Sequence, residues 1–253
     1  MMQGEAAKDR MVLKIGGADR AGFLQGLVTR DIQAPEDGLV YSALLTPQGK
    51  YLADFFLLNR GDDILVDVKS EIAPALAQRL AMYRLRANVS IEDSGLGVTR
   101  GLGLPPQGAW ADPRHAALGW RGYGLEGNAP SIDWDAIRVA HCIPETGLEL
   151  IPNETFILEA GFEALGGVDH RKGCYVGQEV TARMKHKTEL RKGLVTVDLS
   201  GDAPFGTEIF AGERPVGKLL TRAGDKAIAY LRFDRASGEM QAGEAQVTWV
   251  PDT

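Results

Sequence analysis

The chain has 253 residues, of which 44% are hydrophobic and 25% charged, with a formal net charge of −6. This length allows a sizeable core in two or three domains, and the composition is that of an ordinary globular protein. No apolar run is long enough for a membrane-spanning helix, and the mixed-charge N-terminus shows no secretory signal. Two cysteines cannot form a disulfide framework, so we expect a reducing, cytoplasmic setting. The acidic balance argues against stable nucleic-acid binding.

The first predicted elements are a strand at 11–15 and a short helix that Asp19 opens. Polar residues, among them Gln25 and Thr29, surround the chain reversal that ends this helix. Capping and turn hydrogen bonds explain them more simply than ligand contacts do.

From Tyr41 the hydrophobic period changes to that of strands. We predict strands at 41–45, 50–59 and 64–68, a helix that Ser70 caps, and a further strand at 88–92. The apolar face of that helix includes Tyr83. This β-β-β-α-β order is typical of a ferredoxin-like α+β unit built on an antiparallel sheet.

Turns dominate 94–130, and a helix capped by Ser131 is predicted at 131–141. Its Trp134 is most simply a core anchor, although a tryptophan on a cleft wall could also stack on a flat heterocycle. Beyond Lys192 the chain turns to short strands punctuated by Gly and Asp, which predicts a small antiparallel barrel or sandwich.

The segment 165–191, LGGVDHRKGCYVGQEVTARMKHKTELR, carries the clearest chemical signal. Cys174 lies between two glycines, and the residues from Gln178 on suit a short helix, whose N-terminus favours an anion. Arg171 and Lys172 add positive charge, so we expect a reactive thiol. A lone cysteine is more often a buried hydrophobe, so the residues alone leave both interpretations open. Neither cysteine has a CxxC or CxxH partner, so no local metal motif is present.

KGCYVGQEVTAR, at 172–183, resembles the signature of the YgfZ family, folate-binding relatives of the glycine-cleavage T-protein that include a mitochondrial iron–sulfur assembly factor. Segments at 23–32, 44–57, 83–93 and 134–147 agree with the family in the same order. The resemblance implies an α+β fold, in which a ferredoxin-like antiparallel sheet unit lies within a glycine-cleavage T-protein-like fold with a small C-terminal β-barrel. The implied domains are 1–40 with 105–190, 41–104, and 191–253.

The resemblance also implies a cavity for tetrahydrofolate or a one-carbon derivative, with Cys174 as the residue that matters for activity. The cofactor-binding candidates are Trp134, Gln25, Thr29, Tyr83 and Arg86. The supporting motif residues are Lys172, Gly173, Tyr175, Gly177, Gln178, Glu179 and Arg183. Without other context, Glu179 and Arg183 are simply a surface pair at i,i+4.

The implied function is assembly or repair of iron–sulfur proteins, and through them tRNA modification. The implied partners are proteins of the iron–sulfur assembly machinery or client iron–sulfur proteins. We expect no membrane association and a monomeric protein. One alternative is a tetrahydrofolate-dependent aminomethyltransferase, which needs a carboxylate beside the folate; Asp54 and Asp93 are candidates. A second is a non-catalytic folate-binding scaffold. A third, weaker alternative is a Cys–His hydrolase using His141, His170 or His186.

Overall fold

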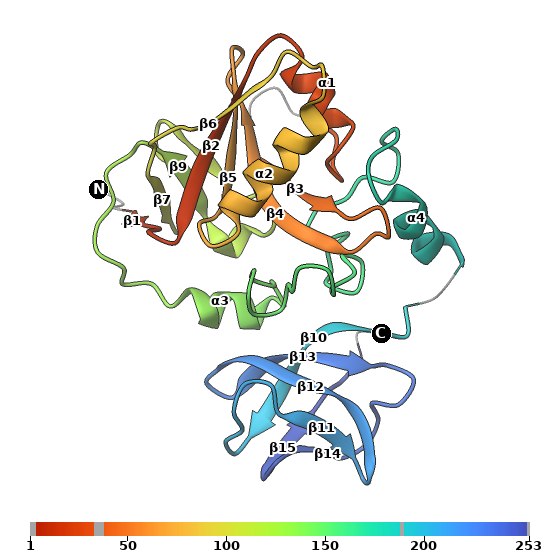
Figure 1. The fold of residues 1–253 in the computed structure, drawn as a ribbon. Helices are drawn as coiled ribbons and strands as arrows, with labels where there is room; N and C mark the ends of the chain where they lie inside the picture. Colours follow the sequence, from red (N-terminus) through yellow and green to blue (C-terminus); the bar gives the residue numbers. More distant parts are fainter. Residues whose placement is uncertain (1–3, 33–37, 188–189, 252–253) are drawn as a thin grey trace. The chain divides into compact units, whose positions relative to one another are not determined.

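The computed structural model describes residues 4–32, 38–187 and 190–251. Within them the chain forms two compact units (Figure 1). The first contains Met1–Ile132, Pro152–Glu154 and Phe162–Val180, and the second contains Asp133–Ile151, Thr155–Gly161 and Thr181–Thr253. Across the described ranges, none of the helices has both the length and the apolar character that a bilayer-spanning segment requires.

The first unit is organised around an antiparallel sheet with strand order β3-β4-β5-β2-β6. These strands are β2 (Arg10–Gly16), β3 (Val40–Leu45), β4 (Tyr51–Asn59), β5 (Ile64–Lys69) and β6 (Ser90–Asp93). Because β2 lies between β5 and β6, the sheet combines residues from both sides of the predicted boundary at 40/41. Sequence periodicity located the strands, but their order in the sheet depends on the long-range pairing of β2 with β5 and β6.

Two helices, α1 (Arg20–Gln25) and α2 (Ala73–Arg84), cover one face of this sheet (Figure 1). Leu24 of α1 and Leu76 and Leu80 of α2 are buried in one cluster with alternate residues of the strands. The predicted cap Ser70 does not begin α2. Ile72 is its N-cap, without a side-chain cap, and a proline follows in the first turn, where its missing N–H costs little.

A smaller sheet of order β1-β7-β9-β8 completes the first unit. Its strands are β1 (Glu5–Ala6), β7 (Val98–Gly101), β8 (Ala109–Ala111) and β9 (Trp120–Tyr123), and the 3-10 turn η1 (Ala116–Leu118) precedes β9. The stretch predicted to consist mainly of turns therefore also contains three short strands, β7, β8 and β9.

The second unit contains α3 (Trp134–Ala140) and a closed barrel of order β10-β13-β12-β11-β14-β15. The strands are β10 (Lys192–Ser200), β11 (Glu208–Ala211), β12 (Arg214–Ala223), β13 (Lys226–Arg232), β14 (Met240–Ala242) and β15 (Ala245–Thr248). Closure removes the free edges and selects the barrel over the sandwich. The predicted cap Ser131 is replaced by Asp133, whose carboxylate accepts from the Ala136 N–H at 2.9 Å.

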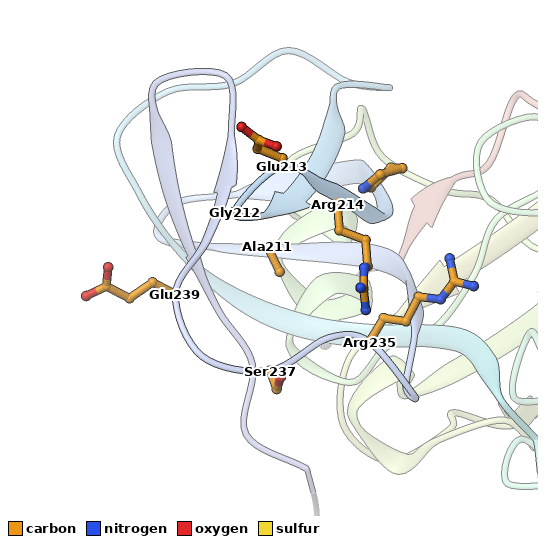
Figure 2. Close-up of a pocket in the computed structure, with 8 residues that line it drawn as sticks. Ala211, Gly212, Glu213, Arg214, Arg235, Ser237 and Glu239 are labelled. Atoms are coloured by element: carbon orange, nitrogen blue, oxygen red, sulfur yellow. The ribbon is translucent and has the colours of Figure 1, made fainter.

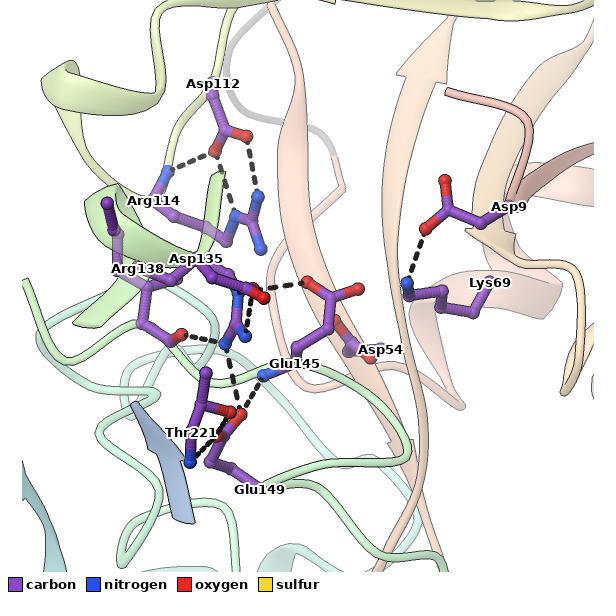
Figure 3. A network of polar contacts seen from close by, with 12 residues as sticks. Asp9, Asp54, Lys69, Asp112, Arg114, Asp135, Arg138, Glu145, Glu149 and Thr221 are labelled. Atoms are coloured by element: carbon purple, nitrogen blue, oxygen red, sulfur yellow. Dashed lines mark hydrogen bonds and ion pairs between the residues drawn. The ribbon is translucent and has the colours of Figure 1, made fainter. Parts of the chain in front are cut away.

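A buried ion-pair network joins α3 to the barrel (Figure 3). The guanidinium of Arg138 donates to Glu149 at 3.1 Å and to Asp135 at 2.8 Å. The fully buried Glu149 carboxylate also accepts from the backbone N–H of Glu145 and from the hydroxyl of Thr221 on β12. Since both charges are paired and hydrogen-bonded, α3 is held against the barrel wall.

Candidate functional site

Cys174 is exposed, in a loop that ends where α4 (Gln178–Lys187) begins. The structure thus places Cys174 at the surface, and the reactivity of its thiol stays a prediction. The second cysteine differs. Cys142 is half-buried at the end of α3, and burial raises the pKa of its thiol to about 12.

Lys172 does not lie beside Cys174 as an exposed cation. Its side chain is buried, and its Nζ donates to the carbonyl oxygens of Val28 at 2.6 Å and Arg30 at 3.1 Å. The ammonium also lies 5.6 Å from the centre of the Tyr175 ring. Burial lowers the pKa of Lys172 to about 8, which the negative charge of Asp31 opposes only in part. Lys172 therefore holds the cysteine loop against the segment that follows α1.

Thr29 forms a second link to the same loop. Its hydroxyl donates to the carbonyl of Gly167 at 2.6 Å and accepts from the Ala43 N–H at 2.9 Å, and its own carbonyl accepts from the Asp169 N–H at 3.0 Å. The side chain is fully buried. These bonds use the hydroxyl inside the protein, so Thr29 does not fit the predicted role of cofactor ligand.

Glycine is required at the end of the loop that leads into α4. Gly177 has φ +85, and a Cβ there would lie 2.6 Å from the carbonyl oxygen of Thr46 in the β3–β4 turn. Gly49 of the same turn has φ +74 and closely approaches Val180. At Gly173, by contrast, a Cβ would meet nothing within 4 Å, and nothing in the structure explains a glycine there.

The remaining motif residues begin α4 or support the loop. Tyr175 is buried, and its carbonyl accepts from the Gln178 N–H at 3.2 Å. Glu179 lies in the first turn of α4, where its charge suits the helix dipole, and both Glu179 and Arg183 are exposed. Among the described residues, no group of three His, Cys, Asp or Glu side chains is placed to hold a metal ion.

The other cofactor candidates lie in different environments. Gln25 accepts from the Ile32 N–H at 3.2 Å, which is an internal bond, and Tyr83 packs against the core of the first unit. Arg86 is exposed after α2, and Trp134 is half-buried at the start of α3, in the second unit. Arg86 and Trp134 thus keep side-chain surface in solvent, whereas Thr29 is buried.

A buried polar layer that sequence reasoning missed covers the second face of the main sheet. Asp54 accepts from the hydroxyls of Tyr41 at 3.0 Å and Tyr51 at 2.8 Å. Burial, with the nearby Asp54 carboxylate, raises the pKa of Tyr41 well above its usual value. Asp54 is only 3% exposed, and Asp93, the other predicted carboxylate, accepts from the Gly95 N–H in a turn.

The same layer contains three arginines around one aromatic ring. The guanidinium carbons of Arg121 and Arg114 lie 4.1 and 4.8 Å from the centre of the Phe56 ring. Asp67 pairs with Arg121 at 3.1 Å and with Arg10 at 2.6 Å. Arg114 pairs with Asp112, as Figure 3 shows. The alternation of side chains along β4, which places Asp54 and Phe56 on one face, is the sequence signal that could have located this layer.

The barrel has a surface pocket of its own, with a volume of about 820 Å³ (Figure 2). It lies between the β11–β12 turn and the segment that leads to β14. Arg214, Arg235, Glu213 and Glu239 line it, so its charges balance. Sequence analysis did not indicate this pocket.

Comparison with known proteins finds similarity to iron–sulfur cluster assembly factors. Residues 191–253 match the family model of the CAF17 C-terminal β-barrel domain. The chain is 29% identical to the mitochondrial iron–sulfur cluster assembly factor IBA57 of Homo sapiens, over 91% of this chain and 78% of that protein. It is 28% identical to the IBA57 of Mus musculus, over 95% of this chain and 81% of that protein. The chain is similar to the IBA57 proteins over most of its length and to CAF17 in its C-terminal barrel.

The solved structure of glycine cleavage system aminomethyltransferase T from Bartonella henselae has the same fold. The TM-score is 0.78 at 13% identity, covering 97% of this chain and 84% of that one. The predicted fold class, a T-protein-like α+β fold with a C-terminal barrel, is confirmed.

The IBA57/CAF17 relatives correct one expectation. We predicted a cytoplasmic protein, but these relatives are mitochondrial, so that prediction is wrong. It rested on two unpaired cysteines, which indicate a reducing compartment without specifying which one.

Proposed function

We propose that this protein acts in the assembly or repair of iron–sulfur clusters, with Cys174 as the thiol that contacts the cluster. The observation that carries the proposal is an exposed Cys174 on a loop fixed by Lys172, in a chain similar to iron–sulfur assembly factors over nine-tenths of its length. Thiolates are the preferred protein ligands of iron–sulfur clusters.

The cluster is cargo in this proposal. When Cys174 Sγ binds iron, the thiol releases its proton to solvent and displaces one existing ligand, without electron transfer. Because the described residues contain no three-ligand group, the other cluster ligands come from a partner protein of the assembly machinery or from a client. Modification of tRNA by client iron–sulfur enzymes, as the YgfZ resemblance implies, would depend on this step.

Complementation tests the role of Cys174. In cells lacking their own copy of the gene, wild type and C142S should restore the activity of an iron–sulfur enzyme, whereas C174S should not. C142S is the matched control because it makes the same sulfur-to-oxygen change at a half-buried site. Full rescue by C174S would instead support the non-catalytic scaffold.

Folate binding is the second part of the proposal. It is supported by the YgfZ resemblance and by the half-buried Trp134, whereas the Thr29 hydroxyl and the side-chain oxygen of Gln25 take part in internal hydrogen bonds. Tetrahydrofolate should quench tryptophan fluorescence saturably in wild type and much less in W134F. An equal, saturable change in both proteins would contradict the role of Trp134, and no change in either would remove folate from the proposal.

The aminomethyltransferase alternative needs a carboxylate open to the cofactor. Asp54 is buried with a tyrosine hydroxyl on each oxygen, and Asp93 belongs to a turn. Robust turnover in a glycine-cleavage exchange assay would favour this alternative despite that geometry.

A further inference from the structure

The end of α2 has an unusual residue at a strained position. Leu85, the C-cap, has φ 46 and ψ −106, a region in which a bulky side chain is an outlier and glycine is usual. The Leu85 side chain is 89% exposed. Burial of this side chain therefore does not offset the backbone strain.

A second exposed apolar side chain lies one turn earlier. Met82 is 63% exposed, whereas Leu76 and Leu80 on the opposite face of α2 are buried in the core. Leu85 follows Met82 by three positions, and both side chains are exposed at the C-terminal end of α2. The core thus leaves two large apolar side chains of this helix end in solvent.

Three exposed arginines belong to the same stretch of chain as Met82 and Leu85. Arg79, Arg84 and Arg86 are exposed, and Arg84 also donates to the Val89 carbonyl at 3.4 Å. From Ile72 to Ile91 the sequence contains these three arginines and no acidic residue, although the whole chain has 34 acidic and 28 basic residues. We call Arg79, Met82, Arg84, Leu85 and Arg86 the α2 end surface.

We propose that the α2 end surface docks an acidic partner protein, whose apolar residues cover Leu85 and Met82 and whose carboxylates face the three arginines. The proposal rests on the proposed function, in that the partner is a protein of iron–sulfur cluster assembly. Complementary charge speeds encounter and excludes basic partners, and a buried leucine at the centre supplies binding energy. This contact would account for a leucine at a backbone position that suits glycine.

Substitution of Leu85 by glycine separates docking from a role in folding. L85G removes the side chain and relieves the positive φ, so the melting temperature should equal or exceed that of wild type. A role in packing would instead lower it. L104A is the control, because Leu104 is another exposed leucine of the first unit, 81% exposed.

Binding is measured by fluorescence anisotropy with a labelled helical peptide of about five turns that carries leucines flanked by glutamates. The full chain should bind this peptide, L85G should raise Kd about tenfold or more, and L104A should leave it unchanged. The same peptide with lysines in place of glutamates should bind R79E/R86E and not wild type. Equal Kd values for wild type and L85G, or no preference for the glutamate peptide, would overturn the proposal.

Complementation distinguishes failure of docking from failure of the proposed function. C174S should bind the glutamate peptide with the wild-type Kd and still not restore the iron–sulfur enzyme, whereas L85G should lose both. If C174S restores the enzyme, the role of Cys174 fails while the peptide result stands by itself. If L85G restores it fully, docking at this surface is excluded.

Discussion

The Nζ atom of Lys172 lies 2.6 Å from the carbonyl oxygen of Val28, a residue 144 positions earlier in the sequence. Lys172 forms a second bond to the carbonyl of Arg30, and together the two bonds fix the loop. The exposed Cys174 lies in this loop, two positions after Lys172. The lysine of the motif thus acts through the backbone and leaves the sulfur accessible.

Replacing Lys172 by methionine should loosen the loop. The variant loses two charge-assisted hydrogen bonds and leaves two carbonyl groups without this donor, but it also removes a buried cation, which partly offsets these costs. We therefore expect the free energy of unfolding to fall by about 1–2 kcal/mol at pH 7. Urea unfolding measures it. K50M is the control, because Lys50 also donates to a carbonyl, that of Glu154, but at an exposed site; a loss as large there would argue against a special role for Lys172.

Stability should depend on pH through the same lysine. The pKa of Lys172 is about 8 in the folded protein, whereas the ordinary lysine value of 10.5 applies to the unfolded chain. Between pH 8 and pH 10.5, Lys172 is therefore protonated more fully in the unfolded chain than in the folded protein. The free energy of unfolding of wild type, minus that of K172M, should therefore rise between pH 8 and pH 10, by about 1–2 kcal/mol. A flat or falling difference would show that Lys172 is not the titrating group.

The two glycines that flank Cys174 should respond differently to alanine. G177A forces a Cβ into the carbonyl of Thr46 at positive φ, which should cost about 2 kcal/mol or more. G173A has open space and should change stability by less than about 0.5 kcal/mol. Thermal unfolding of both variants checks the contrast, and similar losses would contradict it.

Protein stability should depend more on Glu149, at the centre of the buried ion-pair network of the second unit, than on the exposed Asp135. E149A leaves the Arg138 cation without its buried partner, so we expect a loss of about 3–5 kcal/mol, while D135N, at an exposed partner of the same arginine, should cost less than about 1 kcal/mol. Urea unfolding provides the comparison. Equal losses would mean that Glu149 is not the main partner of Arg138.

Thiol labelling should distinguish the two cysteines. Iodoacetamide at pH 8 should modify Cys174 in the folded protein and leave Cys142 largely unmodified, because burial raises the pKa of Cys142 to about 12. Mass spectrometry of the digested protein identifies the labelled residue. Faster labelling of Cys142 would contradict the exposure that the Cys174 proposal requires.

The sequence by itself determined the strands, the helix before β6, the C-terminal barrel and the motif around Cys174, because hydrophobic periodicity and turn residues are local signals. Tertiary structure alone decided that Lys172 binds Val28, that Thr29 is buried and that Asp54 lies between two tyrosines. Each of these depends on a contact between distant segments, and a side chain's sequence neighbours do not specify its long-range partners. The sequence likewise does not predict the strained backbone and the exposure of Leu85, because leucine is common in helices.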